Sequence, residues 1–346
     1  MEKGEDYRLF SCEGRDHMGK GDALSYFYEK LEAEGVALLT ASFPVYATPV
    51  GNTIRELLIS GGESFGLSPQ EDLEVKMSLF ALNRLEFLQA YLSQDIWKET
   101  LILFDRSAFS NALTIAYGIK DFEGITREEI ASLVLKALEL DSLFIEKLNL
   151  KNCVIQLDTG EEDWHSERGR GTDLHEVPDV QRLALDVYSF YREFVGEGWK
   201  VILTKEFDEK EGRRVWRDRE DIFSDIFAFL AEKFGDFKFT EGKGKRGEIG
   251  IKEIMNVVYP GSRVDNNLLS QYSKSIRSND KESMYALSVQ IKKQICASYK
   301  GILFEDKEVR VAFKAILDRY PKIEYVLESS LGKEYILRLQ EALRDE

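Results

Sequence analysis

The stretch that decides the fold is CEGRDHMGKGD, residues 12–22. It follows the phosphate-binding pattern G-x-x-x-x-G-K-[ST] up to Lys20, but Gly21 stands where that pattern has a hydroxyl residue. The apolar segment DYRLFSC comes before it, and the helical pattern DALSYFYEKLEAEG comes after it. A strand, a glycine turn and a lysine that opens a helix surround an anion with backbone N–H groups at the positive end of the helix dipole. The sequence therefore predicts a phosphate-binding loop, with Lys20 reaching the terminal phosphates.

Apolar runs alternate with helical patterns through the first two thirds of the chain. Four further runs are typical of strands that are buried on both faces: VALLTASF, ETLILFDRS, NCVIQLDT and WKVILTKE. Helical patterns separate them, and this alternation predicts an α/β fold, a doubly wound parallel sheet flanked by helices. Ligands bind such a sheet at the carboxyl ends of its strands. We expect the functional residues at that edge.

A boundary is expected near residue 235. The segment GDFKFTEGKGKRGEIG, residues 235–250, is rich in glycine and lysine, and the strand-like runs cease after it. Residues 1–235 hold 27 Lys and Arg against 45 Asp and Glu, a net charge of −18, whereas residues 236–346 hold 20 against 17, a net charge of +3. We predict two domains: residues 1–234, and a small, mainly helical domain of unknown role at residues 235–346.

The composition narrows the class of protein. A chain of 346 residues with 43% hydrophobic residues can bury a sizeable core. It has no apolar run long enough to span a membrane and no apolar core of a signal peptide near its start, so we expect a soluble, cytoplasmic protein. The net charge of −15 argues against general binding of nucleic acid. The three cysteines show no C-x-x-C spacing and are expected to be free thiols.

Four segments resemble, in the correct order, the motifs of the thymidylate kinase family. Residues 13–20 are similar to its E-G-x-D-x-x-G-K loop, residues 44–58 to its T-P-x-G-x-x-I-R-x-L-L segment, residues 79–86 to its L-F-x-x-N-R-x-E helix, and residues 104–113 to its D-R-Y-x-x-S segment. The resemblance leaves the C-terminal part of the chain unexplained. It implies a P-loop kinase fold and an enzyme that phosphorylates a nucleoside monophosphate, first of all dTMP to dTDP, with ATP as phosphoryl donor and Mg²⁺.

The resemblance also implies residues for the donor side. The expected ATP-binding residues are Gly14, Arg15, Asp16, His17, Met18, Gly19, Lys20, Gly21 and Asp22. The expected catalytic residues are Lys20, Asp105, Arg106, Arg168 and Arg170. The last two arginines lie in the glycine-rich segment SERGRGTDLHE, in the place of a lid that closes over ATP, although a solvated charged loop would look similar. Asp16 and Asp105 are the expected metal ligands.

For the acceptor nucleotide, the expected binding residues are Asp16, Tyr46, Phe80, Arg84, Arg106, Ser110 and Asn111. Phe80 and Arg84 are four positions apart on one predicted helix, so an aromatic ring and a guanidinium can meet one ligand. The resemblance implies that Phe80 stacks on the base, that Arg84 bonds to it, that Arg106 grips the monophosphate and that Asp16 meets the sugar 3′-hydroxyl. A core aromatic at Phe80 and a structural ion pair between Asp105 and Arg106 are the alternatives.

Several residues depart from the family pattern. Gly21 lacks the hydroxyl that touches magnesium, and Tyr46 stands where many relatives have arginine. Ser107 replaces the tyrosine of D-R-Y, and Asn111 stands where relatives often have serine. These departures leave open a deoxynucleoside kinase and a non-catalytic nucleotide-binding module. We expect small-molecule nucleotides as partners, with no membrane and no nucleic acid, and a homodimer stays among the options.

Overall fold

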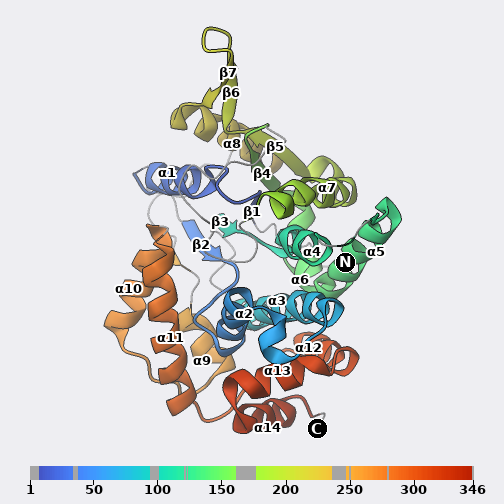
Figure 1. Ribbon diagram of the computed structural model, residues 1–346. Coiled ribbons are helices and arrows are strands. Elements are labelled where there is room, and N and C mark those ends of the chain that lie inside the picture. Colours follow the sequence, from blue (N-terminus) through green and yellow to red (C-terminus); the bar gives the residue numbers. More distant parts are fainter. Residues whose placement is uncertain are drawn as a thin grey trace, which may run out of the picture.

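The computed structural model shows a parallel six-stranded sheet in the order β5-β4-β1-β3-β2-β8 (Figure 1). It describes residues 8–33, 38–93, 101–120, 122, 124–160, 177–235, 247–248, 251–278 and 280–344. The strands of the sheet are β1 (Arg8–Glu13), β2 (Leu38–Ser42), β3 (Leu101–Asp105), β4 (Val154–Asp158), β5 (Trp199–Leu203) and β8 (Gly247–Glu248). Every pairing in it is parallel. The predicted α/β fold with a doubly wound parallel sheet is confirmed.

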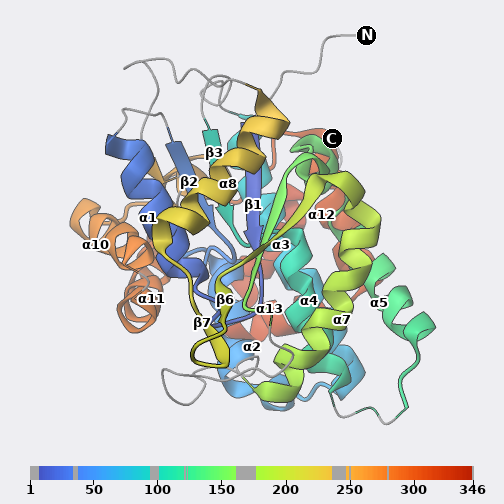
Figure 2. The same cartoon turned by 90° about the horizontal axis from the view of Figure 1, so that it is seen from above.

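Helices cover both faces of the sheet (Figure 2). One face packs against α1 (Lys20–Ala33) and α8 (Arg219–Phe234). The helices over the other face are α2 (Pro49–Ser60), α3 (Pro69–Leu92), α4 (Asn111–Ile119), α5 (Arg127–Leu140), α6 (Ser142–Lys147) and α7 (Pro178–Val195). Successive residues of β3 alternate between the two cores, with Leu101 and Leu103 in the first and Ile102 and Phe104 in the second. This is why the strands read as continuous apolar runs.

Helix α3 is the centre of the larger core. Its first turn is fixed by a capping box, in which Ser68 and Glu71 bond each other's backbone, with Pro69 in the first turn. Beyond this turn the helix is buried on nearly all sides, polar residues included. A helix that is buried all round needs a layer of structure on each side. The sheet supplies one of these layers, and the helices at the C-terminal end supply the other.

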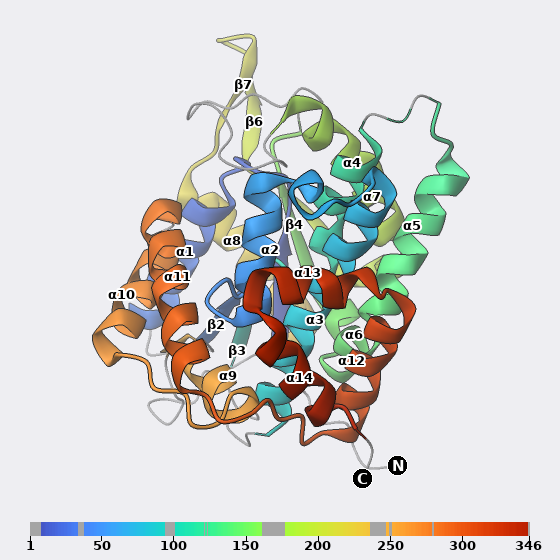
Figure 3. The same ribbon diagram turned by 60° about the horizontal axis from the view of Figure 1, so that its bottom comes forward.

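The C-terminal part of the chain is helical, as predicted, and lies against α2 and α3 (Figure 3). Its helices are α9 (Ile251–Val258), α10 (Asn266–Arg277), α11 (Lys281–Ser298), α12 (Lys307–Arg319), α13 (Lys322–Leu331) and α14 (Lys333–Ala342). Buried residues such as Ile254, Phe313 and Leu327 belong to the same core as those of α3. That residues 1–234 form a domain of their own stays a prediction.

Two strand elements differ from expectation. Strand β8 lies within the segment 235–250, where a boundary was expected, and it pairs with β2 at the edge of the sheet. Two residues are too few to form a periodic pattern, so this strand could not be predicted from the sequence. The second element is an antiparallel hairpin of β6 (Lys205–Asp208) and β7 (Arg213–Trp216), which extends away from the sheet (Figure 1). Within the described residues, no helix combines the length and the apolar character that crossing a membrane requires.

A buried carboxyl group joins the two parts of the chain. Glu86 of α3 accepts hydrogen bonds from Thr48 Oγ1 at 2.8 Å, from Asn83 Nδ2 at 3.0 Å and from the hydroxyl of Tyr259, just after α9. The Tyr259 hydroxyl also lies 3.2 Å from that of Tyr335, on α14. Burial raises the pKa of Glu86 to about 7, against the opposing effect of its hydrogen bonds.

This pKa predicts how stability changes with pH. The folded chain binds a proton at Glu86 up to about pH 7, whereas an unfolded glutamate loses it near pH 4.5. Glu86 therefore contributes stability that is present below pH 4.5 and is lost as the pH rises through about 7, at about 1.4 kcal/mol for each unit between the two pKa values. Urea unfolding at pH 5 and pH 8 should show a smaller loss of stability with rising pH in Glu86→Gln than in wild type. Identical pH slopes would contradict the assignment.

Candidate functional site

The glycine loop joins β1 to α1 at the carboxyl edge of the sheet, as predicted. Gly14 has φ 140° and Gly19 has φ 77°, conformations that favour glycine. A Cβ at Gly14 would lie 2.4 Å from the carbonyl oxygen of Leu157, so only glycine lets the loop pass the end of β4 this closely. The first residue of α1 is Lys20. Backbone and lysine thus have the arrangement that a phosphate cradle requires.

Lys20 and Asp105 meet across the edge of the sheet. The Lys20 ammonium lies 2.6 Å from Oδ1 of Asp105, the last residue of β3. Burial opposes ionisation of Asp105, but the charges of Lys20 and Arg106 outweigh it and lower its pKa. Asp105 is therefore an anion at neutral pH, next to the expected position of the phosphates.

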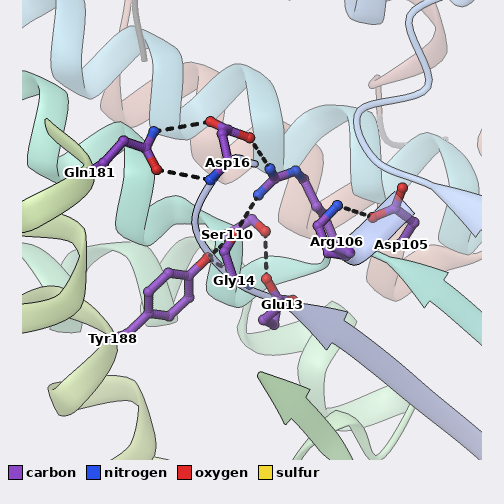
Figure 4. Close-up of polar contacts among 9 residues, drawn as sticks. Glu13, Gly14, Asp16, Asp105, Arg106, Ser110, Gln181 and Tyr188 are labelled. Carbon is purple, nitrogen blue, oxygen red and sulfur yellow. Dashed lines mark hydrogen bonds and ion pairs between the residues drawn. The ribbon is translucent and has the colours of Figure 1, made fainter. Parts of the chain in front are cut away.

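Arg106 links the end of β3 to the glycine loop (Figure 4). Its φ of 69° is unusual for a residue other than glycine, and such strain is frequent at functional sites. The guanidinium donates from Nη1 to the carbonyl of Gly14 at 3.2 Å and from Nη2 to Asp16. Burial opposes the charged form of Arg106, but nearby carboxylates, Asp16 first, raise its pKa. The structural alternative of an Asp105–Arg106 ion pair does not describe this arrangement, because each of the two residues has another partner.

Two residues of α7 complete the cluster around the loop. Gln181 accepts from the backbone N–H of Asp16 at 2.8 Å, and its amide donates to Asp16 Oδ2 at 3.1 Å. The hydroxyl of Tyr188 lies 3.4 Å from both the nitrogen and the oxygen of Gly14 (Figure 4). These contacts fix the carboxylate of Asp16 toward Arg106. Neither residue was predicted from the sequence.

Glu13 anchors the segment that follows β3 to the same loop. Its carboxylate accepts from the hydroxyls of Ser107 and Ser110. Burial raises its pKa, while the two serines oppose this shift. Ser110, an expected acceptor-binding residue, thus contacts Glu13 in the structure. Ser107, which stands in place of the family's tyrosine, holds the turn after Arg106 through the same carboxylate.

A second polar cluster lies beneath the acceptor side and centres on Asp141, directly after α5. Arg84 donates from Nε at 2.6 Å and from Nη2 at 2.7 Å to the two oxygens of Asp141, and Asn111 Nδ2 donates to it at 3.0 Å. Burial raises the pKa of Asp141, against the charge of Arg84. The Oδ1 atom of Asn111 is buried and has no hydrogen-bond partner among the described residues. It could accept a hydrogen bond from a ligand.

The other expected acceptor residues lie nearby in the fold. Tyr46 and Phe80 are both half-buried and pack against the larger core. Tyr46 lies in the turn between β2 and α2, and the ring of Tyr285, on α11, meets it edge-on at 5.2 Å. The role of Arg84 as a ligand for the base stays a prediction, since two of its nitrogens already bond Asp141.

Three further residues of the loop were expected to bind ATP, and two of them are buried. Arg15 is fully buried and bonds Asp158, at the end of β4, at 3.2 Å, so it holds the loop from below. Met18 is buried and His17 has φ 60°. The expected lid arginines, Arg168 and Arg170, lie outside the described residues.

The sequence left clues to some of the residues that were not predicted. Asp141 interrupts the apolar pattern LVLKALELDSLF, and a carboxylate in such a position needs a partner. Glu13 directly precedes the first glycine of the loop at the end of an apolar strand. Gln181 and Tyr188 stand on α7, but nothing in the sequence distinguished them from ordinary helix residues.

Residues 12–149 match the family model described as thymidylate kinase. The chain is also similar to a solved thymidylate kinase from Candida albicans, with 19% sequence identity and a TM-score of 0.42, over 65% of this chain and 92% of that one. No curated protein matches the chain.

The Asp141 cluster gives a test of the site's architecture. Asp141→Ala leaves the buried guanidinium of Arg84 without its carboxylate, and the loss of one partner of a buried ion pair costs about 3–5 kcal/mol of unfolding free energy. Asn111→Ala removes one hydrogen bond to the same carboxylate and should cost about 1–3 kcal/mol. Urea unfolding measures both. A smaller loss for Asp141→Ala than for Asn111→Ala would show that Asp141 does not hold the cluster together.

Proposed function

We propose that the chain is an ATP-dependent nucleoside monophosphate kinase, with dTMP as the acceptor expected first. The observation that carries this proposal is the meeting of two cations and two carboxylates where β1 and β3 end. Lys20 and Arg106 approach the glycine loop from different elements, and each has a carboxylate partner, Asp105 and Asp16. Phosphoryl transfer needs positioning and positive charge around the transferred group rather than covalent chemistry. This cluster supports that type of reaction.

On the donor side, the backbone of the glycine loop would hold the β- and γ-phosphates of ATP, with the ammonium of Lys20 reaching the terminal ones. A phosphate oxygen would compete with Asp105 for Lys20. Arg106, whose raised pKa keeps it charged, would hold the acceptor phosphate through two nitrogens. The roles of these residues follow from their chemistry and position and are part of the proposal.

On the acceptor side, the buried Oδ1 of Asn111 supports recognition of a base with an N–H donor. The amide nitrogen of Asn111 donates to Asp141 Oδ2. The amide oxygen of Asn111, Oδ1, makes no hydrogen bond within the described residues. A buried acceptor without a partner costs free energy unless a ligand supplies the donor. The imide N–H of thymine or uracil would supply it, with the half-buried ring of Phe80 as the expected stacking surface. This argument favours dTMP or a related pyrimidine nucleotide.

The residues present are compatible with magnesium. Magnesium keeps several waters and binds through one or two carboxylates together with substrate phosphates. Asp105 and Asp16 could serve as these carboxylates, and the lowered pKa of Asp105 keeps it ionised. The described residues contain no group of three or more metal-ligating side chains, which such a site does not need. Bound magnesium would neutralise charge between the phosphates.

A coupled assay for ADP release across the nucleoside monophosphates tests the function directly. We expect turnover with one or a few pyrimidine monophosphates, and a loss of at least about a hundredfold in Lys20→Ala, because a charge that stabilises the transition state is removed. Lys30→Ala, which removes an ammonium from the last turn of the same helix, is the matched control and should keep its activity.

The outcomes of this assay separate the alternatives. Turnover with thymidine but with no monophosphate would replace the proposal with a deoxynucleoside kinase. A rise in melting temperature with ATP but no transfer to any acceptor would leave a nucleotide-binding module.

Gly21 gives a second prediction. A missing hydroxyl can be replaced on magnesium by a water, so ATP should still bind, but the metal is held less rigidly and transfer is slower. We expect Gly21→Ser to turn over faster than wild type at limiting magnesium, with little change in ATP affinity. Gly21→Ala, which adds a Cβ without a hydroxyl, is the control. Equal gains in both variants would assign the effect to helix propensity instead of the metal.

A further inference from the structure

The turn between β2 and α2, residues 43–48, belongs to the proposed acceptor side of the site. It begins beside the charged residues at the end of β3. The backbone N–H of Phe43 donates to the carbonyl of Asp105 at 3.0 Å. Ser42 is also the register partner of Asp105 in the sheet. The turn therefore starts at the carboxyl edge where Lys20 and Arg106 converge, and it carries Tyr46.

Asn83 of α3 holds this turn from below. Its Oδ1 accepts from the backbone N–H of Val45 at 2.7 Å, and its Nδ2 lies 3.0 Å from Thr48 Oγ1. Thr48 Oγ1 in turn caps α2 by accepting from the N–H of Gly51 at 2.9 Å. The side chains of Asn83 and Thr48 thus hold the turn, and a shift of either side chain would move the backbone of the turn.

Both of these side chains depend on Glu86. Thr48 and Asn83 donate to the same oxygen, Oε2, while the other oxygen, Oε1, accepts from Tyr259. Glu86 forms no ion pair within the described part of the chain, so neutral donors alone stabilise its buried carboxyl group. Removal of one donor from such a group has a large effect, because the remaining donors must rearrange around it.

The C-terminal helices also contact the turn at a second point. Tyr285 of α11 meets the ring of Tyr46 and lies 5.1 Å under the guanidinium of Arg55, on α2. Two turns further along α11, the ammonium of Lys292 lies 3.0 Å from the carboxylate of Glu56, which belongs to α2. Helix α11 therefore contacts both the turn and the helix that follows it.

We propose that the C-terminal helices serve phosphoryl transfer by positioning the acceptor turn, with Tyr259 as a positioning residue that acts through Glu86 on Thr48 and Asn83. This inference rests on the proposed function, since the turn is taken as part of the acceptor site. It gives residues 251–344 a role in acceptor affinity as well as in stability. Tyr259 itself lies behind the turn and does not touch the acceptor.

The test compares Tyr259→Phe with Tyr335→Phe in the full chain. Tyr259→Phe removes only the hydroxyl that bonds Glu86, whereas Tyr335→Phe removes a buried hydroxyl that contacts Tyr259 and not Glu86. We expect Tyr259→Phe to raise the Kd and KM for dTMP about tenfold, as expected for the loss of one buried hydrogen bond, with kcat and the Kd for ATP within about twofold of wild type. Tyr335→Phe should change the dTMP values by less than about threefold. An unchanged dTMP Kd in Tyr259→Phe, or equal losses for dTMP and ATP, would overturn the inference.

Hydrogen exchange of the ligand-free protein decides the inference independently of the acceptor. The amides of Val45 and Gly51 should exchange about tenfold faster in Tyr259→Phe, while those of α1 and α8, which belong to the other core, keep their wild-type rates. Unchanged exchange at Val45 and Gly51 refutes the positioning role even if no monophosphate binds. Failure of wild type to bind any monophosphate would instead count against the proposed function, and faster exchange of the turn would still support the coupling.

Discussion

The site depends on one close approach, that of the Gly14 backbone to the end of β4. Any side chain at Gly14 would collide with the carbonyl of Leu157, so the loop could not turn there. Because it does turn, α1 starts with Lys20 facing β3, and the carbonyl of Gly14 comes within reach of Arg106 and Tyr188. The conformation of the loop therefore determines the orientation of the charged groups around it. Lys20, Arg106 and Asp16 are placed by the backbone before any ligand enters.

Much of the fold could be predicted because local sequence patterns indicate its strands, its helices and the glycine loop. Strands buried on both faces give continuous apolar runs, helices give a period of 3.6, and a glycine loop before a lysine has a recognisable spacing. The carboxyl edge of the sheet then locates Lys20, Asp105 and Arg106 together. These inferences need only the order of elements, and the structure confirms the five predicted strands of the sheet and their order along the chain.

The partners of the site residues could not be predicted in the same way. Asp16 and Gln181 are 165 positions apart, and Arg84 and Asp141 are 57 apart. Periodicity indicates which face of a helix is apolar, but not which polar residue of another element will lie opposite it. The resemblance implies that Arg84 contacts a ligand, and the pairing with a buried carboxylate, which the structure shows, could not be inferred from it. A buried pair of this kind orients a side chain more than it stabilises the fold, and here it orients Asn111 as well.

The two faces of the sheet pack against two separate cores. The helix that starts at the glycine loop rests on the smaller core with α8, whereas the turn between β2 and α2 rests on the larger core, which continues into the C-terminal helices. Under the proposed function, substitutions in those helices would alter acceptor preference before they disturb the use of ATP. The helices packed on α3 can therefore diverge in sequence while the core beneath the glycine loop stays the same.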